Sequence, residues 1–208
     1  LSTSPHDPML SLASNCVRDY FGPTVQMVFD GLSFRGEPST FSQLVATLRQ
    51  KCRQKVYSEE RIRLLGSAVA SRLQNQSLQL PPLRASLLVL CQHSIVKVTL
   101  SKSKHKLIYY YQLDINRARL LPRYPRYVEY AKKALDTMAA ALVEELLVEG
   151  RLRTVDVVLR TVEHLKASET TEAETSTSSR YTSRQTVLES FKRLVQSGFF
   201  EQVAKLVD

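Results

Sequence analysis

The chain has 208 residues, of which 43% are apolar and 24% charged, with only six glycines. This is the composition of a folded protein with one large or two small apolar cores. The net charge of +9 favours a polyanionic partner without identifying it. No run approaches the roughly 18–20 consecutive apolar residues that cross a bilayer. Three widely spaced cysteines without a CxxC pair exclude a disulfide framework and a cysteine zinc site, and we expect reduced thiols in an intracellular protein.

Apolar residues at helical spacing predict four helices in the first part of the chain. They span residues 10–21, 23–36, 40–48 and 83–94. Gly22-Pro23 separates the first two, because glycine suits the end of a helix and proline the start of the next. Residues 49–80 form a long basic insertion, with a further helix predicted over residues 57–74.

The periodicity changes from helix to strand after residue 94. Residues 95–100 alternate and are β-branched, residues 107–113 are aromatic, and a short polar loop joins them, which predicts a hairpin. Helices followed by a two-stranded hairpin are typical of a winged-helix domain, a helix-turn-helix variant. Residues 83–94 would be its recognition helix, and its inward side chains are predicted to be Leu87, Leu88 and Cys91.

Residues 117–208 predict a second, incomplete copy of this plan. Its helices are predicted over residues 127–149, 155–165 and 184–197. The Ser/Thr/Glu-rich segment 168–180 is predicted to be a flexible linker. The apolar segment after Gly198 is either a first wing strand or a short helix, so this wing is incomplete and we expect a longer parent protein. The predicted fold is mostly α, with two tandem winged-helix units, residues 10–116 and 117–208, and small β-hairpin wings.

The most distinctive motifs are RYPRY at residues 123–127 and VEELL at residues 143–147. Together with DYFG at residues 19–22 and the tyrosine-rich strand at 109–111, they resemble the C subunit of eukaryotic RNA polymerase III. The resemblance implies a family with four winged-helix units and a coiled coil, similar to the alpha subunit of the general factor TFIIE. It also implies a nuclear location and assembly with two other subunits in a peripheral trimer that acts in initiation and promoter opening.

Basic side chains on the hairpin and after it are the candidates for DNA contact. They are Lys102, Lys104, Lys106, Arg117, Arg119, Arg123 and Arg126. Lysines on a hairpin tip can bind phosphates and release counterions, but they can equally keep a hairpin soluble and protect its edge. Arginine and tyrosine together can grip phosphate and stack on bases, yet tyrosines beside a proline can also lock a domain junction. The resemblance favours subunit docking for Tyr124, Pro125 and Tyr127.

Nothing in the sequence resembles an active site, because it has no Gly-rich phosphate loop, GxSxG or HExxH motif. We expect no catalytic residue, metal, cofactor, membrane or small-molecule substrate. Helix 83–94 offers only Arg84, Gln92 and His93 to a DNA groove, which is too few for base reading. The hypothesis is a non-catalytic polymerase III subunit that contacts DNA without sequence specificity. Two alternatives stay open: a free-standing winged-helix transcription regulator, and a winged-helix protein-interaction scaffold without nucleic acid.

Overall fold

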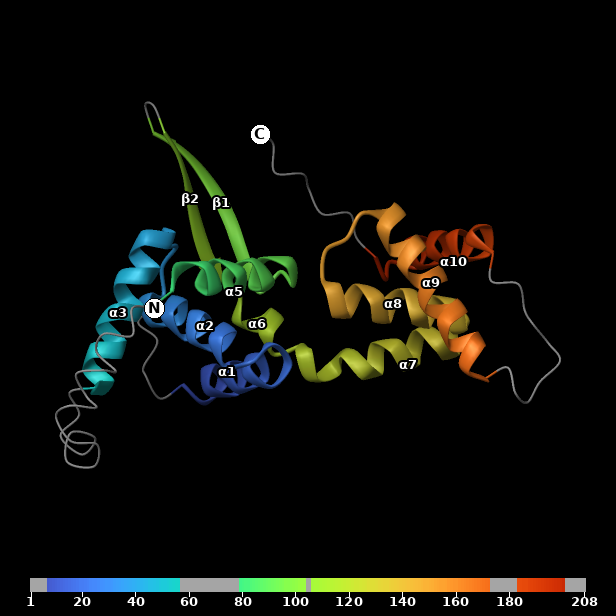
Figure 1. Cartoon of the computed structure of the whole chain (residues 1–208), viewed down its shortest axis with the longest axis horizontal. Coiled ribbons are helices and arrows are strands. Elements are labelled where there is room, and N and C mark those ends of the chain that lie inside the picture. The colour runs from blue at the N-terminus through green and yellow to red at the C-terminus, as the bar shows by residue number, and fades with distance from the viewer. Residues whose placement is uncertain (1–6, 57–78, 104–105, 173–182, 201–208) are drawn as a thin grey trace. The chain divides into compact units, whose positions relative to one another are not determined.

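A computed structural model describes residues 7–56, 79–103, 106–172 and 183–200, in two compact units (Figure 1). Unit 1 is Leu1–Pro122 and unit 2 is Arg123–Asp208. The sequence prediction placed the junction at 116/117, inside the short helix Ile115–Ala118 that belongs to unit 1. Within the described residues, none of the helices is long and apolar enough to span a membrane.

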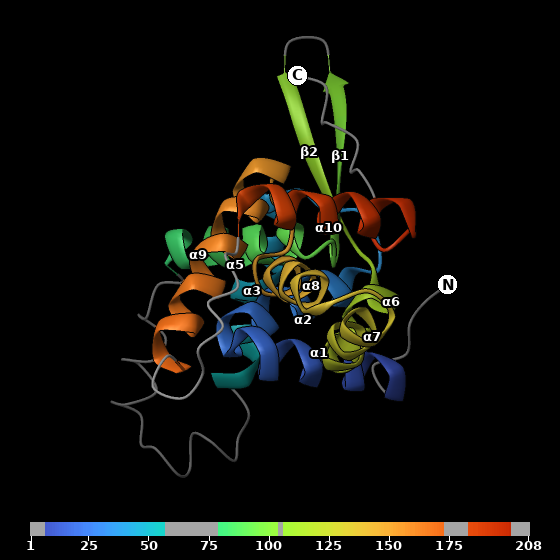
Figure 2. The same ribbon diagram turned by 90° about the vertical axis from the view of Figure 1, so that its right-hand side faces the viewer.

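Unit 1 combines helices with one hairpin. Its elements are α1 (Pro8–Phe21), α2 (Pro23–Arg35), α3 (Phe41–Val56), α5 (Leu80–Gln92), β1 (Val96–Ser103), β2 (Lys106–Leu113) and α6 (Ile115–Ala118). The strands pair antiparallel and without a bulge, and Ser39 forms a single antiparallel bridge with Tyr111. Figures 1 and 2 show the hairpin standing away from the helices, in contact with them at its base.

Local capping explains where these helices begin and end. The Asp7 carboxylate accepts a hydrogen bond from the Met9 N–H (2.9 Å) at the start of α1. Gly22, at φ 89°, ends α1 and precedes Pro23, the first residue of α2, which confirms the predicted break. Thr40 and Gln43 form a reciprocal capping box at the start of α3. That helix continues to Val56, into the predicted basic insertion, whose residues 57–78 lie outside the described part of the chain.

A close approach of α2 to α3 organises the core of unit 1. Leu44 and Leu48 of α3 are fully buried and lie against Gly31 of α2. A Cβ added at Gly31 would meet Leu48 Cδ2 at 2.7 Å and Leu44 Cδ1 at 2.9 Å. Glycine therefore costs helix propensity at this position but permits the contact.

We expect Gly31→Val to lower the free energy of unfolding of unit 1 by about 1–3 kcal/mol, because the added methyls would overpack this contact. Urea denaturation of the full chain measures the change. The control is Ala46→Val on the exposed side of α3, which should cost no more than about 0.7 kcal/mol of helix propensity. Equal effects of the two substitutions would contradict the packing argument.

Unit 2 contains four helices among the described residues. They are α7 (Tyr124–Ala134), α8 (Thr137–Glu149), α9 (Thr154–Glu172) and α10 (Arg184–Gln196). The prediction of one helix over residues 127–149 is wrong: α7 ends at Leu135, which has φ −122° and ψ −86°, and Asp136 caps α8. The helix predicted over 155–165 is longer than expected, so the first residues of the predicted linker are helical.

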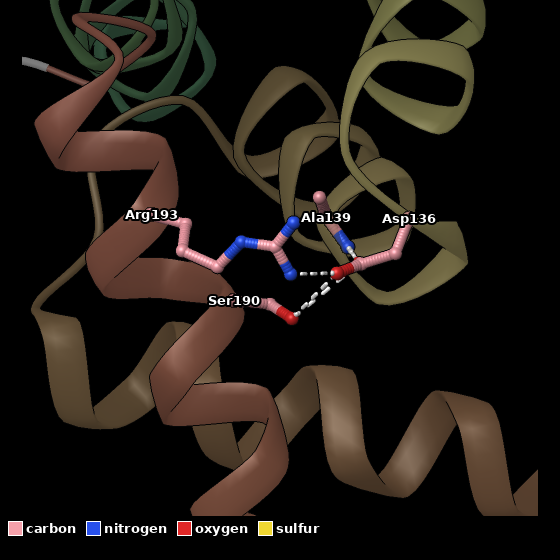
Figure 3. A network of polar contacts seen from close by, with 4 residues as sticks. All are labelled: Asp136, Ala139, Ser190 and Arg193. Carbon is pink, nitrogen blue, oxygen red and sulfur yellow. Dashed lines mark hydrogen bonds and ion pairs between the residues drawn. The ribbon is translucent and has the colours of Figure 1, made fainter.

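Asp136 joins the start of α8 to α10 (Figure 3). One carboxylate oxygen accepts the Ala139 N–H at 2.6 Å. The other accepts the Ser190 hydroxyl at 3.1 Å and the Arg193 guanidinium at 2.8 Å. Ser190 is buried, so its hydroxyl depends on this carboxylate for a partner. One side chain thus caps a helix and fixes a contact across the unit.

We expect Asp136→Ala to lower the free energy of unfolding of unit 2 by roughly 2–4 kcal/mol. The change removes the cap, worth about 1 kcal/mol, and leaves a buried hydroxyl unpaired, which costs about 1–3 kcal/mol. Thermal and urea denaturation measure it. Arg193→Ala is the control, since it removes only a partly exposed ion pair and should cost less than about 1 kcal/mol. A control as damaging as Asp136→Ala would show that the ion pair, and not the cap, holds the two helices.

The predicted mostly helical fold and the first hairpin are confirmed, but the prediction of two wings is wrong for the described residues, which contain a single hairpin. After Gly198, Phe199 stacks on Tyr130 with ring centroids 5.6 Å apart. Phe200 packs against Phe191 at 5.4 Å. These two phenylalanines complete the core of unit 2 instead of starting a paired strand, and residues 201–208 lie outside the described part.

Candidate nucleic-acid and protein interface

Because side chains alternate along a strand, the hairpin has one mostly apolar face and one face that combines polar groups with Ile108 and Tyr110. On the first face, the register pairs are Val98 with Tyr111, Leu100 with Tyr109, and Lys102 with Leu107. Near the base this face is covered by helices, whereas toward the tip Leu107 and Tyr109 are each 48% exposed. We call Leu100, Leu107 and Tyr109 the apolar wing face.

The wing tip carries exposed lysines on both faces. Lys102 is opposite Leu107, on the apolar wing face, and Lys106 is opposite Ser103, on the other face. Both lysines are exposed. The third predicted tip lysine, Lys104, lies outside the described residues. The described lysines can therefore approach a polyanion, or an acidic protein segment, from either side of the tip.

Arg117 and Arg119 lie at the opposite end of the hairpin. Asp114 caps α6 there and forms an ion pair with Lys97 at 2.9 Å. Burial opposes the charge of Asp114, but hydrogen bonds from Lys97 and from the Arg117 N–H hold its pKa below the ordinary value. A strand rises about 3.3 Å per residue, so this cluster is roughly 23 Å from the tip. Arg119, beside a pocket at the hairpin base, and the tip lysines therefore form separate sites.

Arg123 and Arg126 belong to unit 2 and are exposed. The seven predicted DNA-contact residues are thus divided between the hairpin tip, the hairpin base and a second unit, with Lys104 not described. Closeness in sequence suggested one basic cluster, but the unit boundary after Pro122 cuts through it.

The predicted docking residues stand at the start of α7. Tyr124 and Tyr127 are half-buried, with ring centroids 6.4 Å apart, and Pro125 is exposed in the first turn of the helix. Tyr127 packs on the core of unit 2. Part of the RYPRY motif therefore holds this unit together, while its exposed part is free for the predicted docking.

The helix before the wing exposes two leucines on its outer side. Leu88 is 59% exposed, so its predicted inward position is wrong. Leu80, two turns earlier on the same side, is 38% exposed. Arg84 lies over the Phe41 ring at 5.4 Å, and His93 contacts the Phe21 ring at 4.5 Å. Two of the three polar groups expected to face a DNA groove thus contact aromatic rings of unit 1.

The exposed Leu88 was not recognised from the sequence as part of a surface. Its signal was present, since Leu80, Arg84 and Leu88 recur at every fourth position and so form one stripe of a helix. The neighbouring Leu87 and Leu90 are buried, and the run of leucines concealed which side faces outward.

No known protein-family model and no curated protein matches the sequence of the chain.

Proposed function

We propose that the chain is part of a non-catalytic subunit of DNA-directed RNA polymerase III, in its peripheral initiation subcomplex. Unit 1 would be its winged-helix unit, docked on sister subunits through apolar surface and touching DNA without reading sequence. The observation that carries this proposal is that unit 1 has two exposed surfaces of different chemistry. The helix before the wing exposes Leu80 and Leu88, whereas the wing tip exposes Lys102 and Lys106.

Three further features support the proposal. In unit 1, the order of α2, α3, α5 and the hairpin follows the winged-helix plan. In unit 2 only the helical half of that plan is supported. The RYPRY and VEELL motifs at 123–127 and 143–147 carry the resemblance to the polymerase III subunit, and with it the nuclear location and the partner subunits. The proposal requires no membrane, cofactor or small-molecule substrate.

The second candidate is a winged-helix protein-interaction scaffold without a nucleic-acid role. The exposed side of α5 favours it, because Leu80 and Leu88 are exposed there and Arg84 between them lies over the Phe41 ring, which suits a protein surface better than a DNA groove. The same stripe weighs against the third candidate, a free-standing regulator, which needs base-reading side chains on this helix.

The wing tip tests the DNA part of the proposal. We expect Lys102→Glu with Lys106→Glu to weaken duplex binding equally on unrelated sequences and to reduce the slope of log affinity against log salt by about 2, since each phosphate contact contributes about 0.9. Fluorescence anisotropy across a salt series measures both. The matched control reverses two exposed lysines of unit 2, Lys132 and Lys192. Unchanged affinity and slope in the wing variant would favour the scaffold.

Affinity purification of the tagged full-length protein from its own nuclei, with mass spectrometry, tests the polymerase part. We expect the polymerase III core and its peripheral subunits to be recovered. Leu88→Glu should reduce their recovery several-fold, because it places a charge on the proposed docking stripe. Leu12→Glu, at an exposed position of α1, is the control. Recovery of no polymerase subunit with the unmodified chain would overturn the proposal.

A further inference from the structure

Among the residues that the structure describes, the backbone groups on the outer edge of β2 between the Ser39 bridge and the wing tip have no strand partner. Ser39 N–H donates to the Tyr111 carbonyl (3.0 Å), and Tyr111 N–H donates to the Ser39 carbonyl (2.9 Å). The backbone groups of Tyr111 therefore point away from β1. Because this direction alternates with a period of two in antiparallel strands, Tyr109 and Leu107 direct theirs to the same side. Within the described residues, Ser39 is the only partner on this edge.

Of the features that usually prevent strand pairing, this edge lacks a bulge and a proline, and its lysines stand only near the tip. Register runs from Val96↔Leu113 to Ser103↔Lys106 without a bulge, and neither strand contains proline. A straight edge with half-exposed Leu107 and Tyr109 is a template for a further strand. The charges near it are lysines, with Lys102 on the apolar wing face and Lys106 on the other. They leave the middle of the edge apolar and make its tip end positive.

We propose that this edge binds an extended segment of a partner protein by strand addition, and that the segment has alternating apolar residues followed by carboxylates. The Ser39 bridge is antiparallel, so a strand that continues it runs from the hairpin base toward the tip. Its residues opposite Tyr109 and Leu107 share the apolar wing face and are apolar. Its C-terminal end reaches the lysines and is acidic. The inference does not depend on membership of a polymerase, since the edge belongs to unit 1 alone.

Strand addition takes its affinity from main-chain hydrogen bonds and its specificity from alternate side chains. This separates the proposed mode from two others. A partner that used only the side chains of the apolar wing face would not need a free backbone. A nucleic acid would be attracted by the lysines of the wing tip, and the carboxylates of the partner segment would repel it. In the proposed antiparallel pairing, the acidic residues follow the apolar ones.

The experiment uses the full chain and a fluorescein-labelled peptide, Thr-Val-Thr-Val-Thr-Glu-Glu, followed by anisotropy and by the NMR shifts of the Leu107 and Tyr109 amides. We expect Leu107→Pro to weaken binding about tenfold, because proline removes an outward N–H that the β1–β2 ladder does not use. Leu107→Thr, which keeps this N–H, is the matched control. A peptide N-methylated at alternate residues should lose binding without any change in the protein.

The proposal also predicts weaker binding when lysines replace the two glutamates of the peptide. Equal binding by the N-methylated peptide, or by the lysine peptide, would overturn the proposed mode, as would no binding of the original peptide. Displacement of the peptide from the two amides by a single-stranded oligonucleotide would assign the edge to nucleic acid instead. Self-association in sedimentation velocity that Leu107→Pro abolishes would assign it to a second copy of the chain.

Discussion

The wing depends on a small set of backbone hydrogen bonds at its base. Ile95 N–H donates to the Leu90 carbonyl at the end of α5, Asp114 N–H donates to the Ile95 carbonyl, and the reciprocal Ser39–Tyr111 pair fixes the outer edge of β2. We call these hydrogen bonds the seam of the wing. Ile95 and Val96, which lie at it, are buried. Everything proposed for the hairpin follows from it. The seam holds the base of the hairpin in place, and alternation along the paired strands then sets which face is mostly apolar and on which faces the described lysines lie.

Charge has different roles in the two units. In unit 2, Asp136 joins a cap, a buried hydroxyl and Arg193 in one contact between α8 and α10. In unit 1, Lys97 is exposed but forms an ion pair with Asp114 at the base of the hairpin, whereas Lys102 and Lys106 are exposed at its tip. A net charge of +9 is therefore not a single binding surface. The basic side chains that can contact a partner are those that do not hold elements of the fold together.

Local signals were sufficient for much of the fold and insufficient for the site. The break at Gly22-Pro23 and the hairpin follow from backbone preferences and periodicity, which short segments contain. The break at Asp136 was missed because α7 and α8 are both apolar enough to read as one helix, and the cap is completed by Ser190 and Arg193, far along the chain. The exposure of Leu88 and the division of the arginines between units depend on tertiary packing. The roles in DNA contact and docking stay predictions.

The unbroken pairing of the wing makes it a stiff lever with its pivot at the base. Over a length of roughly 23 Å, a rotation of about 10° at the seam carries the tip through about 4 Å. A displacement of this size is larger than a hydrogen bond to one base edge tolerates, whereas contacts with a row of phosphates or with an approaching chain would survive it. The hairpin therefore suits contacts that tolerate a change in the position of the wing tip, and not contacts that require an accurate position.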